Sequence, residues 1–162
     1  MCLISALPKG SKKDMIAIEG FIINGMSTNT HGSGYSCKKN GSDEIYLSKG
    51  YLSEQGLIDS IRSKELNEDD ELIIHHRIGT SGLRESFNMH PFLITDDLAT
   101  LKQIEGTFNL PVMAHNGIIS EFSDGKSDYN DTFLFVQNFM SNPGILDTLK
   151  SDSKLFEKWY KS

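Results

Sequence analysis

Cys2 is the residue of this sequence best suited to nucleophilic chemistry, because it directly follows Met1. A cysteine side chain is small enough for methionine to be removed before it, so we expect the mature chain to begin with Cys2. An N-terminal cysteine combines a thiol, of reference pKa about 8.5, with an α-amine of pKa about 7.7–8.0. The amine can take the thiol proton, directly or through one water, and so activate the sulfur. The alternative is a small apolar residue at the start of a buried strand.

Arg77 ends an apolar segment and is followed by the turn Gly79-Thr80-Ser81-Gly82. The planar guanidinium binds a carboxylate through two parallel hydrogen bonds. An arginine at a strand end, beside a glycine-rich turn, is therefore a candidate for holding a small acid. The alternative is a surface ion pair with the acidic run 68–71, which we expect to be a solvated loop.

The segment His115-Asn116-Gly117 directly follows an apolar stretch. The Asn116 side-chain amide and the Gly117 backbone N–H are two hydrogen-bond donors that could converge on one oxygen. Such a pair forms an oxyanion hole, and losing one donor typically costs about 10²–10³ in rate. The alternative is an ordinary Asn-Gly turn.

Asp131 lies at the start of a predicted helix. Its carboxylate could pair with a substrate ammonium group. The alternative is a helix cap, since aspartate is favoured at that position.

No metal or cofactor site is predicted. The five histidines show no HExxH spacing, and the sequence has no CxxC motif. Gly32-x-Gly34 lacks the third glycine of a dinucleotide fingerprint, and there is no phosphate-binding GxxxxGK[ST] motif.

The elements that must position these residues are mixed, without strict alternation of strands and helices. Apolar runs predict strands and apolar stripes at helical spacing predict helices. The pattern predicts an α+β fold with helices outside an antiparallel sheet pair. The expected strands cover 2–6, 44–47, 72–74 and 111–114, with a hairpin turn at 40–41; the expected helices cover 11–27 (capped by Ser11), 53–65, 95–102 (capped by Thr95 or Asp96), 132–140, a stretch from 143, and 154–160.

Composition narrows the class of protein. The 162 residues suit one domain over 1–162, and the formal net charge of −6 disfavours nucleic acid or an anionic membrane as a direct partner. Two cysteines exclude a disulfide scaffold. No apolar run approaches the ~20 residues of a membrane span, and the first residues do not resemble a signal peptide. We therefore expect a cytoplasmic protein.

The order of the motifs resembles the glutaminase domain of class II glutamine amidotransferases, a branch of the N-terminal nucleophile hydrolases. The resemblance runs from Cys2 to about Phe139, and the arginine and His-Asn-Gly segments are its most specific parts. It rests, in chain order, on Met-Cys, Gly-Ser-Gly-Tyr-Ser, His-His-Arg-Ile-Gly-Thr-Ser-Gly, Asn-Met-His-Pro-Phe, Ala-His-Asn-Gly-Ile-Ile and Asn-Asp-Thr.

The resemblance implies a four-layer α/β/β/α sandwich and a role for each matching residue. Cys2 would be the nucleophile and its freed α-amine the base, while Arg77 and Asp131 would hold the α-carboxylate and α-ammonium of L-glutamine. Asn116 and Gly117 would form the oxyanion hole. Thr80 and His115 would also contribute to substrate binding.

The sequence departs from the family at Leu3, where glycine is usual, at Gly79, where alanine is common, and at Asn130, where serine is common. Leu3 raises the question of crowding beside the nucleophile. Some 20 residues follow Phe139, too few for an ammonia-accepting domain, so the expected ammonia acceptor is a separate synthase subunit. Small standalone versions resemble those carried in phage genomes.

Two alternatives stay open. One is a catalytically silent module on the same fold that senses glutamine or binds a partner. The other is an N-terminal cysteine hydrolase of a different amide, which the zwitterion-matching pair of Arg77 and Asp131 disfavours.

Overall fold

A five-stranded antiparallel sheet forms the centre of the protein. The computed structural model describes residues 1–79, 82–123 and 125–151. The strands follow the order β1-β4-β2-β3-β6, and every neighbouring pair is antiparallel. Their bounds are β1 Leu3–Leu7, β2 Ser33–Lys38, β3 Ile45–Tyr51, β4 Glu71–His76 and β6 Glu105–Phe108.

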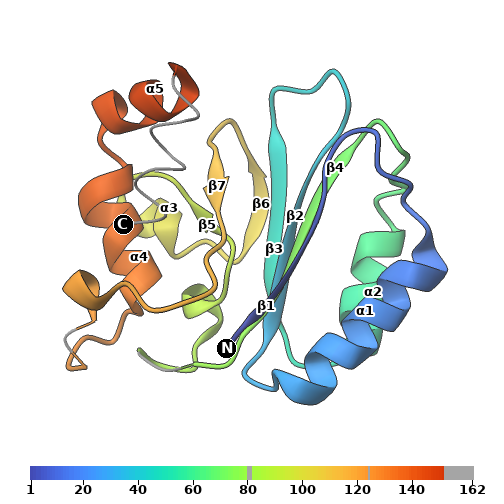
Figure 1. Ribbon diagram of the computed structural model, residues 1–162, viewed down its shortest axis with the longest axis horizontal. Coiled ribbons are helices and arrows are strands. Elements are labelled where there is room, and N and C mark those ends of the chain that lie inside the picture. Colours follow the sequence, from blue (N-terminus) through green and yellow to red (C-terminus); the bar gives the residue numbers. More distant parts are fainter. Residues whose placement is uncertain (80–81, 124, 152–162) are drawn as a thin grey trace.

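Two helices cover one face of this sheet (Figure 1). They are α1, Met15–Thr28, and α2, Glu54–Arg62. Their apolar side chains pack on inward-facing residues of β2 and β4 to form the first hydrophobic core. The largest fully buried contributors are Tyr35, Ile22, Leu57, Ile61, Leu72 and Ile74.

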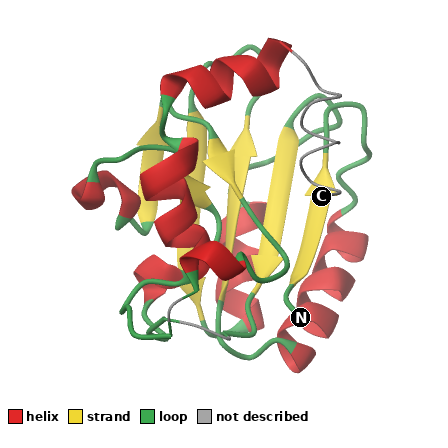
Figure 2. Cartoon of the chain, turned by 60° about the vertical axis from the view of Figure 1, so that its left-hand side comes forward, coloured by secondary structure: helices red, strands yellow, loops and turns green. Residues whose placement is uncertain are grey.

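A second, smaller sheet lies on the other side, with its own helices (Figures 1 and 2). It pairs β5, Phe92–Leu93, with β7, Val112–Met113. A second hydrophobic core joins it to the C-terminal helices through residues such as Phe92, Phe133 and Val136. The elements here are η1 Ser86–Asn88, α3 Leu98–Leu101, η2 Ser120–Phe122, α4 Asp131–Phe135, the π-helical turn η3 Val136–Met140, and α5 Pro143–Ser151.

The predicted α+β class is confirmed, and the four predicted strands correspond to β1, β3, β4 and β7. The helix predicted from residue 11 begins later, because the Asp14 side chain accepts the Ile16 N–H at 3.0 Å and caps α1. Ser11 instead lies in a turn whose N–H donates to Pro8 O. The cap of α3 is Asp97, rather than either residue expected. The helix predicted over 154–160 lies outside the described residues.

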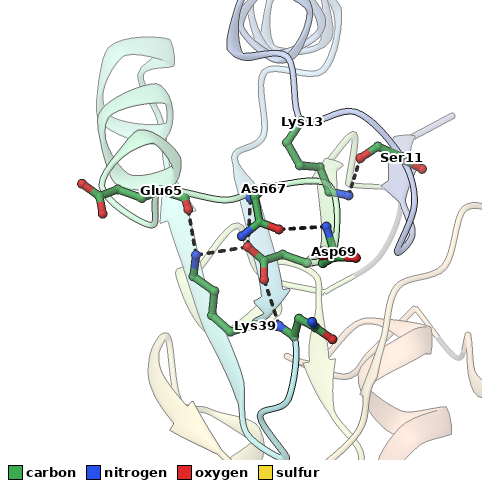
Figure 3. Close-up of polar contacts among 8 residues, drawn as sticks. Ser11, Lys13, Lys39, Glu65, Asn67 and Asp69 are labelled. Carbon is green, nitrogen blue, oxygen red and sulfur yellow. Dashed lines mark hydrogen bonds and ion pairs between the residues drawn. The ribbon is translucent and has the colours of Figure 1, made fainter.

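The acidic run 68–71 is only partly solvated, contrary to expectation. Asp70 is 1% exposed. One of its oxygens accepts the Asn40 N–H at 2.8 Å, and the other accepts the Asn67 N–H at 2.9 Å and the Lys39 ammonium at 3.1 Å. Figure 3 shows Lys39 and Asn67 converging here from separate segments. The carboxylate therefore ties the end of β2 to the loop that enters β4.

Candidate functional site

A pocket lies where β1, β4, β7 and α4 come together. Its atom-free space is about 280 Å³, including the part open to solvent. Cys2 directly precedes β1, Arg77 directly follows β4, Gly117 lies in the segment after β7, and Asp131 begins α4. Residues far apart in the sequence thus form a single lining: Cys2, Arg77, Ile78, Gly79, His90, His115, Gly117, Asn130, Asp131 and Thr132.

Five of the seven site residues expected from the sequence line this pocket: Cys2, Arg77, His115, Gly117 and Asp131. Asn116 is exposed and is not part of the lining. Thr80 lies outside the described residues.

The Cys2 sulfur is half-buried and contacts the main chain just beyond Arg77. The Ile78 N–H donates to Sγ at 3.4 Å, and Sγ lies 3.5 Å from the Ile78 carbonyl oxygen. These two contacts fix the position of the sulfur beside the main chain that follows Arg77.

Leu3 does not crowd the sulfur. It pairs with His76 in the β1–β4 register, and His76 packs on Phe21 and Gly25 of α1. Paired residues of an antiparallel sheet share a face, so Leu3 faces α1. Successive side chains alternate between faces, which leaves Cys2 on the pocket side.

Arg77 is 2% exposed and its main chain is fixed on both sides. Its N–H donates to Gly32 O at 2.9 Å, and its carbonyl accepts the His31 N–H at 3.0 Å. The guanidinium Nη1 donates to Leu83 O at 3.0 Å. Burial lowers the pKa of Arg77, while the nearby Cys2 and Asp131 oppose that lowering. The group stays a cation, since arginine is not deprotonated in proteins.

Gly79 leaves room for this guanidinium. A Cβ at Gly79 would lie 3.1 Å from Nη2 of Arg77 and 3.2 Å from its Cζ. The departure from alanine at this position therefore gives the arginine head more space.

Asp131 is 5% exposed at the first position of α4. The helix cap is Asn130, whose side-chain oxygen accepts the Phe133 N–H at 2.8 Å. Asp131 Oδ2 instead accepts the Ile119 N–H at 2.7 Å. Asp131 is therefore not the cap residue of α4, although its Oδ1 accepts the Thr132 N–H of the first turn at 2.9 Å, and it lines the pocket.

Gly117 has a backbone conformation that other residues rarely adopt, with φ +155°. A Cβ there would also lie 3.0 Å from Cε1 of His115. Burial lowers the pKa of His115, and Asp131 opposes that lowering. The half-buried His115 ring therefore packs on Gly117 as a neutral group near pH 7.

Asn88 is the supporting residue that sequence reasoning missed. It is fully buried, and its Oδ1 accepts the Asn130 N–H at 3.1 Å. The Asn130 side-chain amide donates back to Asn88 O at 2.7 Å. This reciprocal pair fixes the start of α4, where Asp131 lies. In the sequence, Asn88 is marked only by its place in the segment Asn-Met-His-Pro-Phe, which suggests no chemical role by itself.

Among residues 1–79, 82–123 and 125–151, no three or more His, Cys, Asp or Glu side chains cluster so as to hold a metal ion. None of the helices in that part of the chain has the length and apolar character needed to cross a bilayer.

Comparisons with models of protein families, with curated proteins and with solved structures find no match to this chain.

Proposed function

We propose that this protein is a glutamine amidohydrolase that works through an N-terminal Cys2. The observation that carries the proposal is the pocket in which a cysteine sulfur, a buried arginine, a buried aspartate and a glycine with unusual φ converge. A nucleophile beside a fixed cation and a fixed anion matches an amino acid whose side chain is to be attacked.

Arg77 and Asp131 would take the α-carboxylate and the α-ammonium of L-glutamine. Both charges persist through the reaction, so these residues contribute position and specificity more than chemistry. The hydrogen bonds that fix the Arg77 main chain and start α4 support such a role, because they hold the pair before substrate arrives.

The covalent step begins when Cys2 Sγ attacks the side-chain amide carbon of glutamine, its proton having passed to the α-amine. The Gly117 N–H would stabilise the oxyanion of the tetrahedral intermediate. The C–N bond then breaks, and the protonated α-amine gives its proton to the departing ammonia. A γ-glutamyl thioester remains, and water hydrolyses it to glutamate and the free thiol.

Asn116 is absent from the pocket lining, so its amide would have to turn toward the pocket to act as the second oxyanion donor. The same observation favours the second candidate function, a module on this fold that binds glutamine without hydrolysing it. A displaced oxyanion donor would leave binding by Arg77 and Asp131 intact and slow the chemistry.

The proposal includes three further features: the layer architecture, the fate of the released ammonia and the removal of Met1. The four-layer α/β/β/α sandwich is supported by helices on both outer sides of the two sheets (Figure 1). The released ammonia would serve a separate acceptor synthase in the cytoplasm. The free α-amine requires cleavage between Met1 and Cys2, and Met1 is 94% exposed.

The decisive experiment measures glutamate release from glutamine by the wild type, by Cys2→Ala and by Cys37→Ala. Cys37 is the matched control, because it lies in the first core and burial raises its pKa to about 11. We expect Cys2→Ala to abolish release and Cys37→Ala to retain it. Activity that survives in Cys2→Ala would exclude the proposed nucleophile.

Two further measurements separate the alternatives. Intact mass is expected to lack Met1, since a retained Met1 blocks the amine and contradicts the mechanism. Calorimetric binding of glutamine without glutamate release would identify the silent module. Hydrolysis of another amide in preference to glutamine would identify the remaining alternative, an N-terminal cysteine hydrolase of a different amide.

A further inference from the structure

His75 joins the large sheet to the segment that carries Gly117. It belongs to β4 and is fully buried. Its Nε2 lies 3.2 Å from the carbonyl oxygen of His115. A carbonyl oxygen only accepts, so Nε2 carries the hydrogen and Nδ1 is unprotonated. Within the described part of the chain, that Nδ1 has no hydrogen-bond partner.

The His75 ring is held in place by His90. Their ring centroids lie 4.1 Å apart, with 32° between the planes. His90 precedes β5 and His115 follows β7, and both residues line the same pocket. His75 thus lies where the segments that flank β5 and β7 meet the five-stranded sheet.

The His115 ring is fixed from another direction. Its Nδ1 lies 3.4 Å from Oγ1 of Thr132, in the first turn of α4. The same ring packs on Gly117, because a Cβ at that residue would lie only 3.0 Å from Cε1 of His115. The turn is therefore anchored at its carbonyl by β4 and at its side chain by α4.

We propose that His75 is a positioning residue: by holding the His115 carbonyl, it fixes the 115–116 peptide group, which directly precedes the peptide that carries the Gly117 N–H, and so limits the directions that this N–H can take. This inference rests on the proposed function and names the group that keeps the oxyanion donor aimed at the site. Such donors act only when held within about 0.5 Å of the productive geometry.

His75 does this as a neutral group and exchanges no proton with substrate. Burial is the main cause that lowers the pKa of His75 to about 3, so the ring is uncharged at neutral pH. His75 is also absent from the pocket lining, which separates it from residues that touch substrate.

The kinetic test compares His75→Leu with His75→Gln. Leucine removes the donor, and we expect kcat for glutamate release to fall roughly 10- to 100-fold with KM unchanged, because Arg77 and Asp131 are left in place. Glutamine offers an amide donor at nearly the Nε2 position, so most of the lost kcat should return.

The matched control is His76→Leu. His76 is the next residue of the same strand and is equally buried, but it faces α1 and bonds Ser33 Oγ through Nδ1 at 2.7 Å. This variant should lose stability and keep its kcat. A fall in kcat as large as that of His75→Leu would show a general effect of core damage and overturn the inference.

Two NMR measurements test the role of His75 without an activity assay. In the wild type, ¹⁵N shifts of His75 should show hydrogen on Nε2 and none on Nδ1. The Gly117 amide resonance should move in His75→Leu and stay in place in His76→Leu. The opposite tautomer, or an unmoved Gly117 resonance, overturns the inference.

These readouts separate the two proposals. A wild type that releases no glutamate would refute the proposed function, while the tautomer and the Gly117 resonance would still decide what His75 holds. If His75→Leu does not fold, the wild-type tautomer and the His75→Gln spectrum give the same decision.

Discussion

Nδ1 of His31 accepts the backbone N–H of Gly79 at 2.7 Å, just beyond the last paired residues of β2 and β4. His31 also donates its own N–H to the carbonyl of Arg77. The main chain that carries Arg77 is therefore held by neighbouring backbone and by an imidazole, and it does not depend on the guanidinium for its shape.

Arg77→Ala should consequently leave the fold intact and weaken glutamine binding. Hydrogen bonds to charged groups contribute about 1.5–3 kcal/mol, which corresponds to a roughly 10- to 150-fold rise in KM. Leu83 O, the acceptor that Arg77 would vacate, keeps the Asn88 side-chain donor at 3.0 Å. Steady-state kinetics measure the change, and Arg62→Ala, an exposed arginine of α2, is the control. Unchanged KM in Arg77→Ala would show that this residue does not bind the substrate carboxylate.

Gly117→Ala should lower kcat by roughly 10²-fold, because it forces both a strained φ and a close contact with His115 at the oxyanion donor. Gly41→Ala is the matched control: its φ is +78°, with open space around it and a position at the β2–β3 turn. Both variants should lose about 1 kcal/mol of stability. Equal loss of activity in the two would contradict the placement of Gly117 at the reacting centre.

Lys49 gives a pH dependence of stability with an unusual sign. It is 5% exposed, and burial lowers its pKa to about 7. An unfolded lysine titrates near about 10.4. Between these values the unfolded chain binds more protons, so the free energy of unfolding should rise with pH, by up to ~1.4 kcal/mol per unit.

Urea unfolding from pH 7 to about 8.5 measures this slope, below the range in which the raised pKa of Cys37 adds a slope of opposite sign. Lys49→Met should remove it, although it also leaves the carbonyls of Phe87 and Pro91 without this donor. Lys12→Met, at an exposed lysine, should retain it. A slope that persists in Lys49→Met would assign the proton to another group.

Asp70→Asn should cost about 1.5–3 kcal/mol of stability and leave the pocket chemistry unchanged. Its two oxygens accept from Asn40, Asn67 and Lys39, and an amide turns one of these acceptors into a donor. Asp69→Asn is the neighbouring control, because Asp69 is exposed. Denaturant midpoints compare the two, and equal midpoints would mean that the Asp70 carboxylate is not the tie between β2 and β4.

Prediction from the sequence succeeded for the strands and pocket residues whose position follows from local patterns. The apolar runs and the Asn-Gly turn identify β1, β3 and β4, and Cys2, Arg77, Gly117 and Asp131 all line one pocket. These residues are set by their chemistry or by the strand they end, which local patterns reveal.

Sequence reasoning failed where long-range partners decide. Asp70 is buried because Lys39 and the Asn40 N–H, 31 and 30 residues away, reach it in addition to the nearby Asn67 N–H, and no local pattern contains the two distant partners. β5 is two residues long and exists through its pairing with β7. Likewise the choice of Asn130 over Asp131 as cap depends on Asn88, 42 residues away. Asn116, predicted as an oxyanion donor, is exposed and is not among the residues that line the pocket.

The contact between the Cys2 sulfur and Ile78 spans 76 residues of chain. Asp131, which lines the same pocket, comes still later, so the pocket exists only once the first and last thirds of the chain have met. Closing such long loops is slow, because their entropy must be lost before any contact is gained. The ability to bind substrate should therefore be among the last properties to appear during refolding. A ligand seated there would stabilise the whole molecule, since it bridges the segments that separate on unfolding.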